Sequence, residues 1–385
     1  MSEYQYYEFA AIDRPLTRPE MAELRAVSSR ADITPSGFTN HYEWGDLKAD
    51  PADWMRRYFD AFIYTANWCS CRLALRLPLA TFGKAELTPF TTSHALTVDA
   101  GDDHWIFYWS LDESENQDRF GMEDGSGWMR RLAPLRDELL RGDLRPLYLG
   151  WLAGATGGEI RDDALEPELP PGLSALSPPQ QALAEFLEID SDMLAAAATG
   201  SANASRADVA ELDRIDEWVG EWQRDEMVVV LKLIAQGRAH DAERRVKSSH
   251  AAWLKARRPS RVCTTSQRSV AELRELAKSA SGMRLEREAK ERATQEAERH
   301  RQREAYLRLL MANVDKRWDA IHEQAQRGSA SGYEQATRAL AELSDGYALT
   351  ASRETFDHAL RRFLVRHATR PALLRRLSEA GIWSG

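Results

Sequence analysis

The chain has 385 residues, with a hydrophobic fraction of 43% and an aromatic fraction of 9%, values typical of a folded globular protein and not of a disordered one. That length is sufficient for two or three domains with their own cores. The net charge of −9 is unevenly distributed, since residues 1–250 carry about −18 and residues 251–385 about +9, a contrast that indicates an interaction surface.

The same sequence predicts no membrane span, because no window approaches eighteen consecutive apolar residues. The start, MSEYQYYEF, lacks a basic region followed by an apolar run, so no signal peptide is expected. Three cysteines, Cys69, Cys71 and Cys263, are too few for a disulfide framework. This cysteine usage predicts a reducing, cytoplasmic location.

Residues 1–165 predict an α+β domain. Alternating side chains predict a strand at 5–11, and residues 33–44 form a second expected extended segment. Thr17 and Asp50 are each expected to cap the start of a helix. Leucines at 73, 75, 77 and 79 alternate with Arg72, Ala74, Arg76 and Pro78, which predicts a strand with one buried and one solvated face. Segments 94–99 and 104–111 form a predicted hairpin, whose second strand is apolar on both faces and should be covered on both. The order predicts a mostly antiparallel sheet with helices on one face.

From Gly127 onward the pattern is helical. Residues 159–179, rich in Asp, Glu and Pro, predict a linker, and helices are expected at 178–198, 206–222 and 225–256. These elements form an expected helical domain at 166–260.

A long charged helix is predicted at 269–327, within a segment at 261–330. Ser269 and Glu272 form a capping box at its start, Gly328 ends it, and Gly282 is a possible break. An uninterrupted helix of this length would span roughly 90 Å. Its apolar residues between 285 and 305 are too sparse for a core, whereas a packing stripe begins at Leu307. We therefore expect a solvated bridge with each end packed into a different body, followed at 331–385 by a helical-hairpin bundle similar to tetratricopeptide repeats.

One glycine-rich segment and one pair of cysteines are the candidates for a cofactor or metal site. Residues 154–158 contain three glycines, but no Lys-Ser/Thr pair follows as a phosphate loop requires. Cys69 and Cys71 would need Cys263, His94 and His104 to complete a zinc site, and their spacing is unusual for zinc. Small apolar residues entering a strand are the simpler interpretation. We expect no cofactor and no metal.

The α+β domain contains His41, His94 and His104 and several turn aspartates, but neither Gly-x-Ser-x-Gly nor His-Glu-x-x-His. The sequence therefore assigns no catalytic residue. A metal-dependent nuclease built from scattered carboxylates stays open, with Asp102 and Asp103 as its best candidates.

Two groups of basic residues are candidates for nucleic-acid contacts, because helical rows of arginine can meet phosphates. The alternative is that they solvate helix faces or cover the acidic front domain. Neither group has aromatic residues interleaved on an exposed strand, so base stacking is not indicated. The candidates are Lys255, Arg257, Arg258, Arg261, Arg361, Arg362, Arg366, Arg370, Arg375 and Arg376.

Four segments carry a resemblance to a known group: YYEFAAIDRPLT, RRYFDAFIYTANW, GDLRPLYLGWL and HATRPALLRRLSEAGI. In these the chain resembles a family of uncharacterised bacterial proteins, whose genes lie near those of SWIM-type zinc-finger or helicase-like proteins. The resemblance covers the first domain and the ends, and it brings no catalytic residues. It implies a part in a multi-protein assembly on nucleic acid, in genome defence.

Three functional hypotheses follow. The first is a non-catalytic interaction or scaffold subunit with a protein partner, using the long helix and the helical tail. The second is a nucleic-acid-binding accessory protein, and the third is the nuclease. The sequence leaves the oligomeric state open.

Overall fold

The computed structural model describes residues 4–112, 114, 125–202, 215–257 and 268–383. It divides into two compact units, Met1–Gly282 and Met283–Gly385. The predicted fold class is confirmed, since an antiparallel sheet with helices is followed by an all-helical region with a long helix. The four segments expected from the sequence are grouped more coarsely here, because residues 165 and 260 both fall within the first unit.

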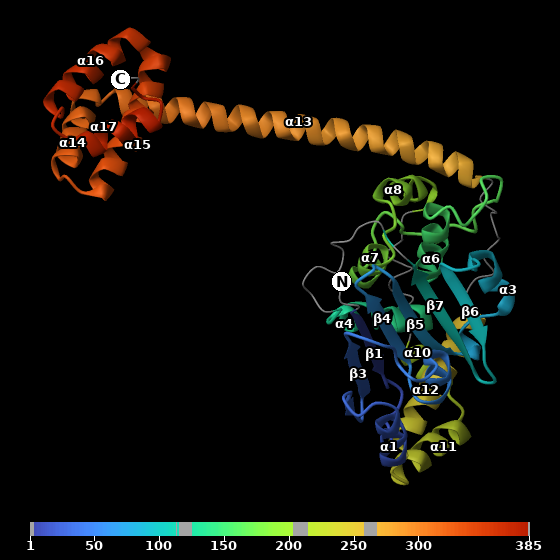
Figure 1. Cartoon of the computed structure of the whole chain (residues 1–385). Coiled ribbons are helices and arrows are strands. Elements are labelled where there is room, and N and C mark those ends of the chain that lie inside the picture. The colour runs from blue at the N-terminus through green and yellow to red at the C-terminus, as the bar shows by residue number, and fades with distance from the viewer. Residues whose placement is uncertain (1–3, 113, 115–124, 203–214, 258–267, 384–385) are drawn as a thin grey trace. The chain divides into compact units, whose positions relative to one another are not determined.

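The first unit is built on a seven-stranded sheet in which every neighbouring pair of strands is antiparallel (Figure 1). Its order is β2-β3-β1-β4-β5-β7-β6. The predicted hairpin forms as the pair β6–β7, and β7 lies inside the sheet as its two apolar faces indicated. The strands are β1 (Gln5–Ala10), β2 (Asp32–Thr34), β3 (Gly37–Tyr42), β4 (Ala61–Ala66), β5 (Cys71–Pro78), β6 (Leu96–Ala100) and β7 (His104–Leu111).

Helices cover both faces of this sheet. On one face Leu73, Leu75 and Trp109 are fully buried under a group of helices that follow the sheet in the chain. These are α4 (Trp128–Leu132), α5 (Leu135–Leu140), α6 (Arg145–Thr156), α7 (Pro178–Phe186) and α8 (Ser191–Gly200). Short turns at Leu79–Thr81 (η1) and Thr88–Phe90 (η2) flank the small helix α3 (Lys84–Leu87).

The other face packs against α1 (Arg18–Val27) and α2 (Pro51–Arg57). Trp54 and Met55 of α2 share a buried cluster with Ala74 of β5 and Ile106 of β7. The expectation of helices on one face only was therefore wrong, because two early helices cover the face that carries Ala74. The alternation expected for the strand is confirmed, and on its second face Ala74 is buried while Arg72 is exposed.

The next helices that the structure describes in the first unit are α10 (Ile215–Glu221), α11 (Arg224–Ala235) and α12 (Ala239–Arg257). The segment 225–256, expected to be helical with Gly237 as punctuation, forms α11 and α12, and Gly237 lies between them with a positive φ of 74°. The predicted helix at 206–222 begins outside the described residues. α12 packs against η1, which follows β5 directly. This contact places α11 and α12 beside one end of the sheet.

The long helix is α13 (Val270–Met311), and α14 (Val314–Gln326) follows it. The single helix expected at 269–327 was therefore wrong, since the chain turns at residues 312–313. Gly282 does not interrupt α13. The Ser269–Glu272 capping box is confirmed, with the Ser269 amide 2.7 Å from a Glu272 carboxylate oxygen. Val270 and Leu273 belong to the core of the first unit, and every residue from 289 to 303 is exposed.

In the second unit, the C-terminal end of α13 packs together with α14 and three further helices. These are α15 (Ala330–Thr350), α16 (Arg353–Arg366) and α17 (Pro371–Glu379). Its core includes Leu310 at the end of α13, Leu340 of α15 and Phe363 of α16. The expected packing of the two helix ends into different bodies is therefore confirmed. None of the described helices is both long enough and apolar enough to cross a membrane.

Candidate anion-binding site

A buried carboxylate, Asp60, organises the end of the sheet where β4 begins. Asp60 is 0% exposed and accepts hydrogen bonds from the backbone amides of Ile12 (2.7 Å) and Asp13 (2.8 Å) and from the Nη2 atom of Arg76 (2.7 Å). Burial alone would raise the pKa of Asp60. The positive charges of Arg76 and Arg136 and the Asp13 amide outweigh that effect and hold the pKa below its ordinary value.

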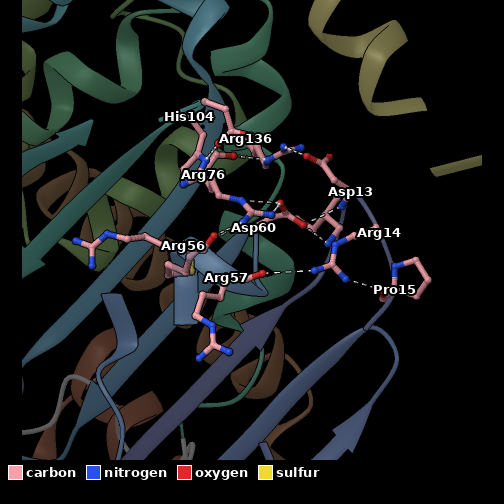
Figure 2. A network of polar contacts seen from close by, with 12 residues as sticks. Asp13, Arg14, Pro15, Arg56, Arg57, Asp60, Arg76, His104 and Arg136 are labelled. Atoms are coloured by element: carbon pink, nitrogen blue, oxygen red, sulfur yellow. Dashed lines mark hydrogen bonds and ion pairs between the residues drawn. The ribbon is translucent and has the colours of Figure 1, made fainter. Parts of the chain in front are cut away.

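Arg136 of α5 extends this network. Its Nε atom donates to the backbone oxygen of Arg76 (2.7 Å), and its Nη2 atom donates to Oδ2 of Asp13 (2.6 Å). Figure 2 shows Asp13, Asp60, Arg76 and Arg136 pointing toward one another from four separate segments. The network therefore joins the chain after β1 to β5 and to the helix layer.

Two polar atoms of this network make no hydrogen bond to the described residues. Nη1 of Arg136 and Oδ1 of Asp13 are both buried, and neither has a hydrogen-bond partner within the described part of the chain. Arg136 is only 2% exposed and Asp13 only 8%. Buried polar groups in folded proteins are almost always hydrogen-bonded. Both atoms are enclosed by the protein and expose almost no surface, so they are unsatisfied groups inside the network.

Both residues line a cavity of about 830 Å³ between the end of the sheet and the helices α11 and α12. This volume is in the range of small-molecule sites. The lining residues are Asp13, Arg14, Arg56, Arg57, Arg76, Leu77, Pro78, Asp103, His104, Arg136, Trp222, Glu226, Val229, Val230, Leu233, Arg238, Asp241, Arg244, Arg245, Ser248, Ser249 and Ala252.

The cavity walls are strongly basic, with eight arginines against four carboxylates in that lining. Several of these arginines are paired with acids, such as Arg14 with Glu20 (2.6 Å) and Arg244 with Asp241 (3.1 Å). Arg245 on α12 is exposed and forms no ion pair with the described residues. It is therefore a positive charge at the rim that is available to a ligand.

Apolar and polar residues both line the helix side of the cavity. Val229, Val230 and Leu233 of α11 form a small hydrophobic patch there. The same side is lined by three arginines, two carboxylates and two serines, namely Arg238, Arg244, Arg245, Glu226, Asp241, Ser248 and Ser249. The cavity thus offers charged groups on both sides and hydrophobic contact on α11.

The structure places the predicted nucleic-acid residues elsewhere, since none of those that are described lines this cavity. Lys255 lies 3.8 Å from a Glu86 carboxylate oxygen. Arg257 pairs with Glu221 and stacks on the ring of Trp253. Arg258 and Arg261 lie outside the described residues.

The C-terminal nucleic-acid candidates have three kinds of surroundings. Arg370 and Arg376 donate to backbone oxygens at residues 326 and 330, so they hold neighbouring helices together. Arg375 is 3.6 Å from Glu379. Arg361, Arg362 and Arg366 are exposed along α16.

The predicted metal and catalytic candidates are dispersed. The thiol of Cys71 donates to the backbone oxygen of Phe186 (3.0 Å) in the core. His94 pairs with Asp112 (3.1 Å), and His104 pairs with Asp103. Cys263 lies outside the described residues. Within the part of the chain that the structure describes, no three His, Cys, Asp or Glu side chains form a group that could hold a metal ion.

Sequence reasoning did not single out Asp60, Arg76 or Arg136. One signal was present, because Asp60 is a lone charge within the apolar run Phe59–Ile63. Such a charge must be paired when the run is buried. Its partners, however, lie at positions that spacing along the chain does not reveal.

Comparisons with known proteins give no relative for this chain: no family model matches it, and neither a curated protein nor a solved structure does.

Proposed function

We propose that this chain is a non-catalytic binding protein whose first unit holds an anionic ligand in the arginine-lined cavity. The observation that carries the proposal is the set of eight arginines that line the cavity, among which Arg245 is exposed and forms no ion pair with the described residues.

The physical argument concerns the charge of the cavity. Its lining carries eight arginines and four carboxylates, so positive charge is in excess. Phosphate and carboxylate oxygens accept hydrogen bonds from guanidinium groups, and arginine is well suited to such oxygens.

The test is calorimetric titration of the full chain with pyrophosphate, in the wild type and in two matched charge reversals. Arg245 lines the cavity, whereas Arg224 is an equally exposed arginine at the start of α11 that does not. Both variants change the total charge equally. Arg245→Glu should weaken binding by about tenfold, and Arg224→Glu should have little effect. Equal effects, or no binding by the wild type, would contradict the proposal.

A second candidate function is the interaction subunit, and the exposed middle of α13 favours it. The fifteen successive residues 289–303 of this helix are all exposed, so this part of the helix gains little stability from packing within the chain. Exposed helix surfaces are common docking elements. The resemblance to proteins encoded near SWIM-type or helicase-like partners supports an assembly on nucleic acid. Leu309 is 70% exposed near the end of this helix. A partner recovered by native co-purification should be lost in Arg299→Glu, within the exposed stretch, and kept in Arg338→Glu, at an exposed position of α15 outside it; recovery with both variants would contradict a role for this surface.

A further inference from the structure

A second pocket lies on the sheet face that packs against α1 and α2, at the opposite end of the strands from the arginine-lined cavity. Its volume is about 690 Å³, and it shares no lining residue with that cavity. Tyr7 of β1, Tyr64 of β4 and Arg72 of β5 line it and lie directly opposite one another on neighbouring strands. Side chains in such positions are neighbours on one face of a sheet.

Arg72 supplies an exposed positive charge to this pocket. Its side chain is exposed, and its Nε atom donates a hydrogen bond to Oγ of Ser110 (3.2 Å). Neither of its Nη atoms has a partner within the described part of the chain, and Arg72 forms no ion pair there. A guanidinium with two free Nη groups matches the two oxygens of a carboxylate.

Asp46 brings a negative charge to the same pocket. It is exposed, and its carboxylate accepts a hydrogen bond from the Nε2 atom of Gln5 (2.5 Å). The Oε1 atom of Gln5 accepts hydrogen bonds from the hydroxyls of Tyr7 (3.0 Å) and Tyr64 (2.9 Å). Because Gln5 is buried, this network holds Asp46 close to the two tyrosines.

Arg72 and Asp46 act on the same tyrosine. Burial raises the pKa of Tyr64, the carboxylate of Asp46 raises it further, and the guanidinium of Arg72 lowers it. Both charges therefore lie near Tyr64, although they form no ion pair with each other. A ligand that carries two opposite charges can meet both.

The charges in the lining define the ligand class. Asp46 and Asp112 place two carboxylates beside one guanidinium, so a multiply charged anion such as phosphate would be repelled. A bare cation would leave Arg72 without a counter-charge. Asp112 pairs with His94 (3.1 Å), which leaves Asp46 as the carboxylate for the ligand. A molecule with one carboxylate and one ammonium group satisfies Arg72 and Asp46 together.

The apolar part of the lining suits a flat ring. Trp68, in the turn between β4 and β5, is 38% exposed at the pocket, although tryptophan is highly buried on average. Leu47, Ala49 and Pro51 line the pocket in the segment that leads into α2. A ring packed against these residues would bury apolar surface and so favour binding.

We propose that this pocket binds a free aromatic amino acid, with its carboxylate at Arg72, its ammonium group at Asp46 and its ring beside Trp68. This site goes beyond the anion-binding function proposed above, because the two sets of lining residues are separate. Its test is therefore independent of the test with pyrophosphate.

Ligand-detected NMR titration of the full chain separates the three parts of the ligand. L-phenylalanine should bind about tenfold more tightly than 3-phenylpropionate, which lacks the ammonium group, and than 2-phenylethylamine, which lacks the carboxylate. L-alanine, which lacks the ring, should also bind more weakly. An analogue that binds as tightly as L-phenylalanine, or no binding of L-phenylalanine at millimolar concentration, would overturn the proposal.

Two variants assign the charged groups, and two exposed residues outside the pocket supply matched controls. Asp46→Asn should weaken L-phenylalanine about tenfold but leave 3-phenylpropionate unweakened, whereas Arg72→Gln should weaken both. Arg30→Gln and Asp32→Asn, at exposed positions outside the lining, should change neither. Because all four side chains are exposed, the variants should fold. Equal effects of a pocket variant and its control would show that binding occurs elsewhere and would overturn the proposal.

Discussion

Arg136 and Asp13 lie 123 residues apart in the chain, and the Nη2 atom of one is 2.6 Å from the Oδ2 atom of the other. Both side chains are almost completely buried. This pair fixes the segment after β1 to the helix layer across the end of the sheet. Both residues also line the cavity, so the pair that holds the fold together borders the candidate site.

Removing one partner of this pair should destabilise the first unit strongly. Arg136→Ala leaves the carboxylate of Asp13 buried without its counter-charge, which typically costs about 3–5 kcal/mol. Arg131→Ala is the control, because Arg131 forms an exposed pair with Glu185 worth at most about 1 kcal/mol. Urea denaturation measures both, and a similar small loss in the two variants would contradict the role assigned to Arg136.

The depressed pKa of Asp60 predicts a loss of stability in acid. The folded state holds this pKa below its ordinary value of 3.8, so the unfolded chain binds the proton more readily. The stabilisation is therefore present above about pH 4 and is lost as the pH falls through the folded pKa. The Asp60→Asn variant has no carboxyl group to protonate at this position, so it lacks this loss of stability in acid. The difference in unfolding free energy between wild type and variant should shrink from pH 7 to pH 3, and a constant difference would contradict it.

The second unit should weaken in mildly acidic solution because of two stacked histidines. Nδ1 of His322 lies 3.0 Å from Nε2 of His367. Burial lowers both pKa values, and the cations of Arg366 and Arg370 lower that of His367 further, while Asp319 acts in the opposite direction on His322.

The unfolded chain consequently binds protons more readily below about pH 6.5, and stability falls as the pH drops from 7 to 5. Protection factors for amide hydrogen exchange in α15 and α16, which correct for the slower intrinsic exchange at lower pH, should therefore decrease over this range. His322→Gln should reduce that decrease. An identical pH response in the variant would show that the histidine pair is not its cause.

Replacement of glycine by alanine should have opposite effects on stability at two positions. A Cβ atom at Gly150 of α6 would lie 2.8 Å from Cδ1 of Trp109 and from Cβ of Leu96, in the core between helix and sheet. Gly150→Ala should therefore cost about 1–3 kcal/mol through overpacking. A Cβ atom at Gly282 of α13 would meet nothing within 4 Å. Gly282→Ala should raise helix stability by up to about 1 kcal/mol, and thermal unfolding of the two variants distinguishes the signs.

Local patterns in the sequence were sufficient for the elements that depend on neighbours in the chain. The hairpin β6–β7 and the capping box of Ser269 and Glu272 were predicted because alternation and capping act over a few residues. The end of α13 was not, since no proline or glycine occurs at residues 311–314. The turn there lets both Leu310 and Ile321 reach the core of the second unit, and this tertiary contact overrides helix propensity.

The candidate site was harder to predict for the same reason. Asp60 was recognisable as a charge within an apolar run, but Arg76 had the pattern of a solvated strand position and Arg136 that of an ordinary helix arginine. Their roles depend on pairings over 16 and 60 residues, respectively: from Arg76 to Asp60 and from Arg136 to the backbone oxygen of Arg76. Only the folded sheet with its helix layer brings these groups together.

The most direct test of the central claim is a crystal structure of the full chain grown with tungstate, a heavy analogue of phosphate, located by its anomalous scattering. The account predicts one dominant peak in the cavity, with a tungstate oxygen within hydrogen-bond distance of the guanidinium group of Arg245. A tungstate bound elsewhere, with only water in the cavity, would contradict it.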